Sequence, residues 1–248
     1  MAAHPLGRIA PQNFDHVEAM PLRALGDAGP SNVPVSIGTN WYTDFDSPRQ
    51  LSDGSWHLPS AKQIRGTIRG GHCTCLAPAG AVKVLKEAWR VFYNQDAEGA
   101  CEGFGHARTQ TLIHYMGASE VDSLDGVLFD AWDLYDRARE LEGTYPSGEG
   151  TTNKAVCEVL EQDGIRPQRG YSVCTRGAYD GPADPGIASF RWATTAEEVC
   201  GALGRPGAEA VPLLNSWGTA YPMVVWLPTD TLERLLEEGG EADVVADA

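Results

Sequence analysis

The chain has no apolar run that approaches the length needed to cross a bilayer. Its N-terminus, MAAHPLGRIAPQ, has neither the apolar centre nor the overall shape of an export signal. Basic residues are scarce, since 19 Lys and Arg against 34 Asp and Glu give a formal net charge of -15. A chain this acidic repels phosphate backbones. We therefore expect a cytoplasmic protein that binds neither membranes nor nucleic acid.

Internal repeats, low-complexity tracts and heptads are also absent. The 248 residues include six cysteines, which are spread out apart from Cys73 and Cys75. In a reducing compartment most of them should be free thiols. Hydrophobic residues make up 42% of the chain, which is enough for a full core in one large domain or in two lobes.

Strand-like segments lie near both ends of the chain, and helix-like segments lie in its middle. Alternation and β-branched residues predict strands over residues 33–42, 68–76, 187–193, 210–218 and 223–227. Helical spacing of apolar residues predicts helices over residues 101–116, 127–141, 153–164, 195–204 and 230–240. The acidic stretch EEGGEAD near the C-terminus is interpreted as a solvated face and tail.

This distribution favours an α+β protein with a helical lobe and a β lobe built from both ends of the chain. The expected divisions are an N-terminal arm (1–32), the first part of the β lobe (33–93), the helical lobe (94–180), and the second part of the β lobe with a C-terminal helix (181–248).

The segment NQDAEGACEGFG carries one cysteine, Cys101, where a loop ends and a predicted helix begins. The unpaired N–H groups of a helix start lower a thiol's pKa and favour the nucleophilic thiolate. Gly99 and Gly103 remove side-chain bulk around the thiol, and Gln95 offers an amide donor for a developing oxyanion. The alternatives are a buried structural thiol for Cys101 and a loop amide bonded to backbone for Gln95.

The segment LLNSWGTAYP places Asn215 at a strand end, two residues before Trp217. A side-chain carbonyl there can orient an imidazole, and an indole can shield that contact from water. The simpler interpretation is a strand that ends in a turn, with Trp217 in the core.

Together these segments resemble the papain-like cysteine peptidases. NQDAEGACEGFG is similar to their nucleophile segment, and NSWGTAYP is similar to their Asn-Ser-Trp-Gly segment. Further stretches, among them IGTNWYTDF, RGGHC and RWATTAEEV, resemble a bacterial and bacteriophage branch of the family. The resemblance runs from about residue 33 to the end of the chain and adds a weak likeness in LGRI.

The resemblance implies a fold of two lobes, one helical and one a β barrel, with the catalytic cleft between them. It implies that Cys101 is the nucleophile and that Gln95 supplies the oxyanion-hole side chain. His72 would act as general base and then acid, Asn215 would orient its imidazole, and Trp217 would cover that bond.

Two features depart from the family pattern. The usual chain order is Cys, His, Asn, whereas the order here is His72, Cys101, Asn215, so the block with the histidine strand is permuted to a position before the cysteine segment. A catalytic triad is defined by geometry rather than by chain order, so this permutation does not exclude activity. The second departure is Glu102, whose carboxylate beside the nucleophile would raise the thiol's pKa.

The remaining histidines and cysteines carry weaker patterns. His106 lies on the same predicted helix as Cys101 and turns away from the thiol, so we expect surface or core packing for it. Cys73 and Cys75 should share one strand face, with His72 on the other. No zinc-like ligand spacing is present, so we expect no metal and no organic cofactor. Cys157, Cys174 and Cys200 are interpreted as structural or free thiols.

The predicted function is thiol-dependent hydrolysis of a peptide or protein substrate through an acyl-enzyme. The alternative is a catalytically idle papain-like fold that acts as a binding or phage-associated structural protein. The sequence leaves the oligomeric state open.

Overall fold

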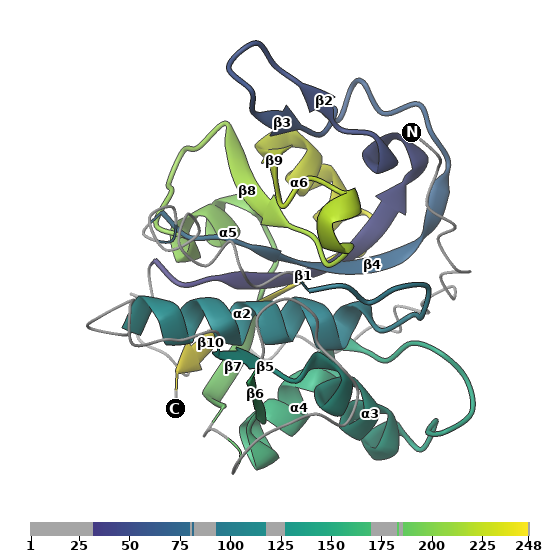
Figure 1. Ribbon diagram of the computed structural model, residues 1–248. Coiled ribbons are helices and arrows are strands. Elements are labelled where there is room, and N and C mark those ends of the chain that lie inside the picture. The colour runs from purple at the N-terminus through teal and green to yellow at the C-terminus, as the bar shows by residue number, and fades with distance from the viewer. Residues whose placement is uncertain are drawn as a thin grey trace.

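The computed structural model describes residues 32–79, 81, 93–117, 127–169, 183 and 186–247 (Figure 1). The expected N-terminal arm, apart from Asn32, and Cys174 lie outside these described residues. In the described part of the chain, no helix is both long enough and apolar enough to span a membrane.

The chain is a mixed α and β protein. Its strands are β1 (Val35–Tyr42), β2 (Arg49–Gln50), β3 (Trp56–His57), β4 (Ile68–Leu76), β5 (Val127–Phe129), β6 (Pro167–Arg169), β7 (Ile187–Ala193), β8 (Ala210–Leu214), β9 (Val224–Pro228) and β10 (Glu241–Asp247). Its α-helices are α2 (Cys101–Gly117), α3 (Ala131–Glu142), α4 (Asn153–Asp163), α5 (Ala196–Ala202) and α6 (Thr229–Glu237). Two short 3-10 helices are η2 (Thr43–Asp46) and η5 (Gly218–Ala220).

One eight-stranded sheet unites the two ends of the chain, in the order β2-β3-β9-β8-β4-β1-β10-β7. Strands β4 and β8 are antiparallel neighbours, with Cys75 opposite Leu214 and Leu76 opposite Leu213. The expectation that the two distant β segments share a sheet is therefore confirmed. The sequence also predicted a barrel, but no pairing between the edge strands β2 and β7 closes the sheet among the described residues.

The acidic C-terminal stretch, residues 237–243, was interpreted wrongly in its second half. Glu237 is an exposed residue at the end of α6, but Glu241–Asp243 are not a solvated tail: they begin β10, which lies between β1 and β7 in the sheet. Val244 and Val245 are buried on opposite faces of this strand, and Asp243 is fully buried as well. The acidic residues obscured the strand pattern, because the apolar residues of β10 are small. The buried carboxylate of Asp243 is tolerated because it has a partner inside the protein.

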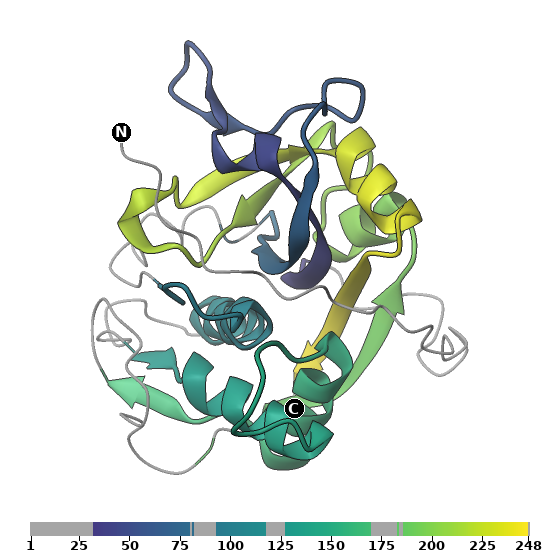
Figure 2. The ribbon, with the colours of Figure 1, turned by 90° about the vertical axis from the view of Figure 1, so that its right-hand side faces the viewer.

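The two largest hydrophobic cores among the described residues lie on the two sides of the sheet. One packs β1, β8 and β9 against α5 and α6, and includes Trp41, Phe45 and Leu232. The other is built around α2, α3 and α4, and includes Phe104 and Tyr135. Viewed along its axis in Figure 2, α2 lies between the sheet and the pair α3 and α4. The start of α2 is therefore held between sheet and helices, which fixes the position of Cys101.

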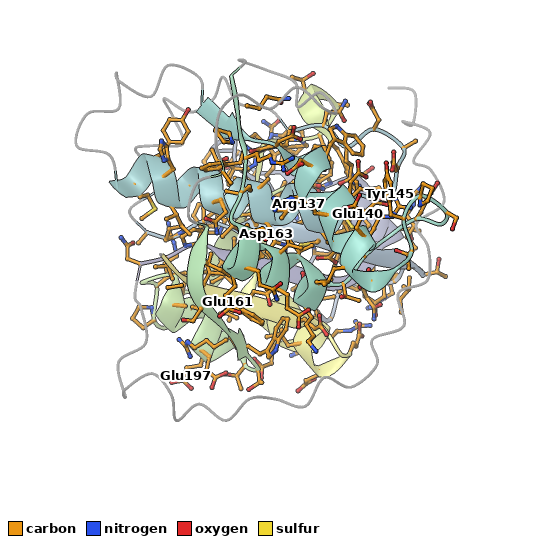
Figure 3. The ribbon with its side chains drawn as sticks, turned by 90° about the horizontal axis from the view of Figure 1, so that it is seen from below. Arg137, Glu140, Tyr145, Glu161, Asp163 and Glu197 are labelled. Carbon is orange, nitrogen blue, oxygen red and sulfur yellow. The ribbon has the colours of Figure 1, made fainter. Side chains whose placement is uncertain are left out.

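The predicted helix over residues 127–141 begins later than expected. Val127–Phe129 form β5, which pairs with β6. Asp130 then caps α3, because its carboxylate accepts the backbone N–H groups of Trp132 and Asp133. The outer face of α3 and α4 is charged, with Arg137, Glu140 and Asp163 in view in Figure 3. The amphipathic pattern correctly predicted a helix here, but the Asp130 cap determines the residue at which α3 begins.

Two glycines let α2 approach its neighbours closely. A β-carbon on Gly103 would lie 2.6 Å from the carbonyl oxygen of Ala131 on α3. A β-carbon on Gly105 would lie 2.5 Å from the sulfur of Cys73 on β4. Neither position tolerates a side chain in the present packing, so Gly103 sets the distance from α2 to α3 and Gly105 sets the distance from α2 to the histidine strand β4.

We expect Gly105→Ala to destabilise the protein by about 1–3 kcal/mol, because the added methyl group overpacks the α2–β4 contact. The matched control is Gly201→Ala in α5, where a β-carbon meets no heavy atom of the described residues within 4 Å. This change should be neutral or stabilise by up to about 1 kcal/mol through helix propensity. Urea unfolding of both variants measures the difference, and equal stabilities would contradict the close-approach argument.

Candidate active site

The pairing of β4 with β8 brings His72 to Asn215, although 143 positions separate them. His72 lies on β4 and Asn215 directly follows β8. The imidazole Nε2 lies 2.9 Å from the Asn215 Oδ1, and both side chains are buried. The sheet itself therefore places the amide against the imidazole.

The hydrogen bonds of Asn215 assign the protons of the His72 ring. The Asn215 Oδ1 also accepts the backbone N–H of Ser216 at 2.7 Å, so this atom is the amide oxygen. An oxygen can only accept, and Nε2 must then carry the donated proton. In the neutral ring the lone pair is consequently on Nδ1, which is the nitrogen available as a base.

An aromatic shell encloses the imidazole. The ring of Trp217 stacks on it at a centroid distance of 4.8 Å and an interplanar angle of 25°. Trp41 meets it edge-on, also at 4.8 Å, and Tyr221 packs edge-on against Trp217. Burial lowers the pKa of His72 to about 4, and the Asn215 hydrogen bond only partly opposes this. The imidazole is therefore neutral near pH 7.

The stretch that leads to Cys101 is tied to the Asn-Ser-Trp-Gly turn by backbone hydrogen bonds. The Gln95 N–H donates to the Ser216 carbonyl, and the Gly218 N–H donates to the Tyr93 carbonyl, each at 3.0 Å. Asn94 and Trp217 form an isolated antiparallel bridge between them. These contacts anchor the cysteine segment beside the residues that orient His72, whatever their order along the chain.

The Gln95 side chain is nearly buried, with 6% of its surface exposed. Its Nε2 donates one hydrogen to the carbonyl of Glu98 at 3.2 Å. The amide nitrogen carries a second hydrogen, which can serve an oxyanion. Among the described residues, the amide oxygen has no hydrogen-bond partner.

The Cys101 sulfur lies at the junction of α2 and β4. The backbone N–H groups of Cys73, of Glu102 and of Cys101 itself lie near the sulfur and favour its thiolate form. These donors lower the thiol's pKa, but burial and the Glu102 carboxylate raise it by more, to about 12. The thiol is thus neutral near pH 7 and only 4% exposed. The sequence predicted both the helix-start donors and the opposing carboxylate, but not the dominance of burial.

The strand alternation expected for β4 is present. Cys73 and Cys75 are on the α2 side, since the Cys73 sulfur lies against Gly105 and Cys75 shares a buried cluster with Leu112 of α2. His72 is on the other side, against Trp41 and Trp217. The sequence analysis missed Trp41 and Tyr221 as parts of the imidazole's surroundings. Trp41 lies in the strand segment IGTNWYTDF, but no local pattern separates it from a core tryptophan.

The neutral, buried state of His72 predicts a pH dependence of stability. The folded-state pKa of about 4 is below the ordinary 6.5. The unfolded chain therefore binds a proton first, and stability falls as the pH drops from 6.5 towards 4. Protonation of this histidine in the unfolded chain should lower the free energy of unfolding by about 2–3 kcal/mol at about pH 4.5. Urea unfolding at several pH values should show that His72→Gln loses less stability on acidification than wild type, and parallel losses would contradict the assignment.

Comparisons with known proteins give one structural likeness. No protein-family model matches the chain, and no curated protein matches its sequence. Among solved structures it is similar to the Amb a 11 cysteine protease, a major ragweed pollen allergen, in its proform. The two share 13% sequence identity with a TM-score of 0.47, over 67% of this chain and 65% of that one. The chain thus spans slightly less than two thirds of that protein.

Proposed function

We propose that the protein is a papain-like cysteine peptidase with a permuted segment order, which hydrolyses amide bonds of a peptide or protein substrate through an acyl-enzyme. The observation that carries the proposal is the His72–Asn215 hydrogen bond of 2.9 Å. It leaves Nδ1 as the basic nitrogen of the ring, on β4, the strand against which α2 and its first residue Cys101 pack. Among the described residues no hydrogen bond joins Cys101 to His72, so the proposed proton transfer requires the two side chains to meet around the substrate. The sequence resemblance assigned the same residues to these roles.

The proposed first step begins from neutral partners. The Cys101 sulfur attacks the substrate carbonyl carbon while His72 Nδ1 takes the thiol proton. The carbonyl oxygen becomes an oxyanion, which the second hydrogen of Gln95 Nε2 stabilises. Asn215 holds the ring and accepts from Nε2–H throughout, which stabilises the imidazolium that forms.

Collapse of this intermediate breaks the carbon–nitrogen bond. The imidazolium gives its proton to the leaving amine, and a thioester on Cys101 remains. Neutral His72 then takes a proton from water, which attacks the thioester carbonyl carbon. When the carbon–sulfur bond breaks, the imidazolium returns this proton to the Cys101 sulfur, which releases the acid and restores the thiol. Trp217 and Trp41 exclude other water from the ring.

The neutral resting pair differs from the thiolate that the helix start was expected to favour at Cys101. Burial favours the uncharged form of each group, so the proton moves during attack rather than before it. The exposed fraction of 4% and the raised pKa of Cys101 also favour a second candidate. This is an idle papain-like fold that acts as a binding or phage-associated structural protein.

The two candidates make opposite predictions for one experiment. The native protein is incubated with casein, an unstructured substrate, and peptides are identified by mass spectrometry before and after treatment with iodoacetamide. The peptidase produces cleavage products that disappear once Cys101 is alkylated. The idle fold produces none, and its Cys101 reacts with iodoacetamide only in urea.

A further inference from the structure

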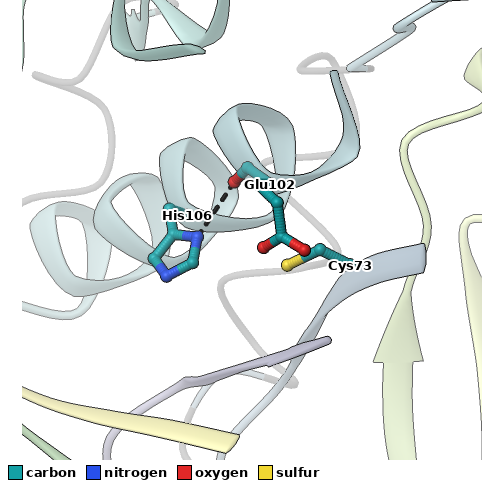
Figure 4. Close-up of side chains that lie close together, drawn as sticks. All are labelled: Cys73, Glu102 and His106. Carbon is teal, nitrogen blue, oxygen red and sulfur yellow. Dashed lines mark hydrogen bonds between the residues drawn. The ribbon is translucent and has the colours of Figure 1, made fainter. Parts of the chain in front are cut away.

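A cluster of five buried ionisable side chains lies in the interior between β4, α2, α4 and β10. Its members are Cys73, Glu102, His106, Cys157 and Asp243, each at most 2% exposed. Two groups of three share His106: one with Cys73 and Glu102, and the other with Cys157 and Asp243. Within each group the potential ligand atoms all lie within 4.8 Å of one another. Figure 4 shows the first group, with the Glu102 carboxylate next to the Cys73 sulfur.

The second group has the spacing of a tetrahedral metal site. The His106 Nε2 lies 3.1 Å from the Asp243 Oδ2 and 3.5 Å from the Cys157 sulfur. Ligands of a tetrahedral zinc ion, with zinc bonds of about 2.0–2.3 Å, are about 3.3–3.6 Å apart. The two contacts of His106 therefore differ from this spacing by at most a few tenths of an ångström, and the Cys157 and Asp243 ligand atoms lie within 4.8 Å of each other.

The other ring nitrogen of His106 is already oriented as in a metal-binding histidine. Nδ1 lies 2.9 Å from the backbone carbonyl oxygen of Glu102, one helical turn earlier (Figure 4). A carbonyl oxygen only accepts, so Nδ1 carries a proton. This contact fixes the ring orientation and presents Nε2 to Cys157 and Asp243, which is the usual outer-shell arrangement of histidine ligands.

Asp243 adds an independent indication. It is fully buried, and its second oxygen, Oδ1, has no hydrogen-bond partner among the described residues. Buried carboxylate oxygens are normally satisfied, because an unsatisfied one costs free energy. A cation held by this carboxylate would provide the missing interaction.

We propose that His106, Cys157 and Asp243 bind a structural zinc ion that joins α2, α4 and β10. Imidazole, thiolate and carboxylate are the donor types that zinc takes in proteins, and one neutral and two anionic ligands balance its charge. The Glu102 carboxylate, which shares the other group of three with His106, can supply a fourth, oxygen donor. The site is independent of the proposed hydrolysis, since none of the three ligands belongs to the proposed catalytic unit.

The simpler arrangement of the same atoms is a buried ion pair between a protonated His106 and Asp243, with Cys157 as a neutral thiol. The ion pair accounts for the contact of 3.1 Å but gives the sulfur no role. Metal content and the environment of the sulfur therefore distinguish the two arrangements.

The test uses the full-length protein, expressed with added zinc and analysed by mass spectrometry for metal. We expect about one zinc ion per chain and a lower melting temperature after chelation. Adding Co²⁺ to the chelated protein should produce the visible bands of tetrahedral cobalt and an ultraviolet sulfur-to-cobalt band. Cys157→Ala should lose the ultraviolet band, and Asp243→Asn, which keeps the side-chain volume, should lose most of the bound metal.

The control is Cys200→Ala, which removes a buried thiol from the opposite core and should keep both the metal and the bands. A wild-type protein that contains no zinc, takes up no Co²⁺ and melts at the same temperature with and without Zn²⁺ would overturn the proposal in favour of the ion pair. A sulfur-to-cobalt band that persists in Cys157→Ala would also overturn the ligand assignment.

Discussion

Replacement of Cys101 by alanine is expected to abolish hydrolysis of peptide substrates. The substitution removes the sulfur that forms the thioester in the proposed mechanism, while the small side chain keeps the start of α2 intact. Loss of the nucleophile from a cooperating catalytic unit costs on the order of a millionfold in turnover, so we expect a fall of at least about a thousandfold even in a slow enzyme. Product formation from a fluorogenic peptide measures the change.

Cys200→Ala is the control for this prediction. Cys200 is buried in the core around α5 and α6, and in the described part of the chain no hydrogen bond joins it to Cys101, His72, Asn215 or Gln95. Its loss should leave the turnover number within about twofold of wild type. Equal activity of Cys101→Ala and Cys200→Ala would show that the nucleophile is a different group.

His72→Ala should reduce turnover by about two to four orders of magnitude, the usual contribution of a general base. The wild-type pH profile should be distinctive. Neutral His72 is the active form, and its pKa is about 4, so activity should persist below pH 6 and fall only near pH 4. A pH–rate profile with a peptide substrate measures this acid limb.

Asn215→Ala should have a smaller effect on turnover and a predictable effect on the same limb. The Asn215 hydrogen bond raises the pKa of His72, so its loss should move the limb to a lower pH. A limb near pH 6.5 in wild type, or one that Asn215→Ala leaves unmoved, would argue against this imidazole as the base.

The strands that carry the site could be predicted from local pattern. The predicted 68–76 segment matches β4, and the predicted 187–193 segment matches β7. Alternation also placed His72 opposite Cys73 and Cys75, because side-chain direction along a strand is fixed by the backbone. What made these predictions possible is that each depends only on neighbouring residues.

The interior cluster could not be predicted in the same way. His106 was interpreted as a packed or surface residue, and Asp243 lay in a presumed tail. Their contact of 3.1 Å depends on β10 entering the sheet beside β1, which is a long-range pairing without a local signal. The sequence showed no zinc-like ligand spacing, because Cys157, His106 and Asp243 come from three separate elements that only the fold brings together.

The electrostatics of the candidate site were also beyond the sequence. Glu102 and the helix start were visible as opposing influences on the Cys101 thiol, but burial is the largest influence in the structure. Burial depends on how closely α2 packs on β4, and Gly105 sets that distance through a contact with Cys73. Local spacing in the sequence shows which groups neighbour the thiol. Only the packed structure shows how far the thiol is shielded from solvent.

In the proposed mechanism, Cys101 is activated by His72 and forms a covalent acyl intermediate. Intact-protein mass spectrometry during reaction with an amino-acid p-nitrophenyl ester tests it most directly, with peptide mapping to locate the adduct. We expect a transient mass increase equal to the acyl group, located on Cys101, absent from Cys101→Ala and formed much more slowly in His72→Ala. An adduct on another residue, or one formed at the same rate in wild type and His72→Ala, would contradict the account.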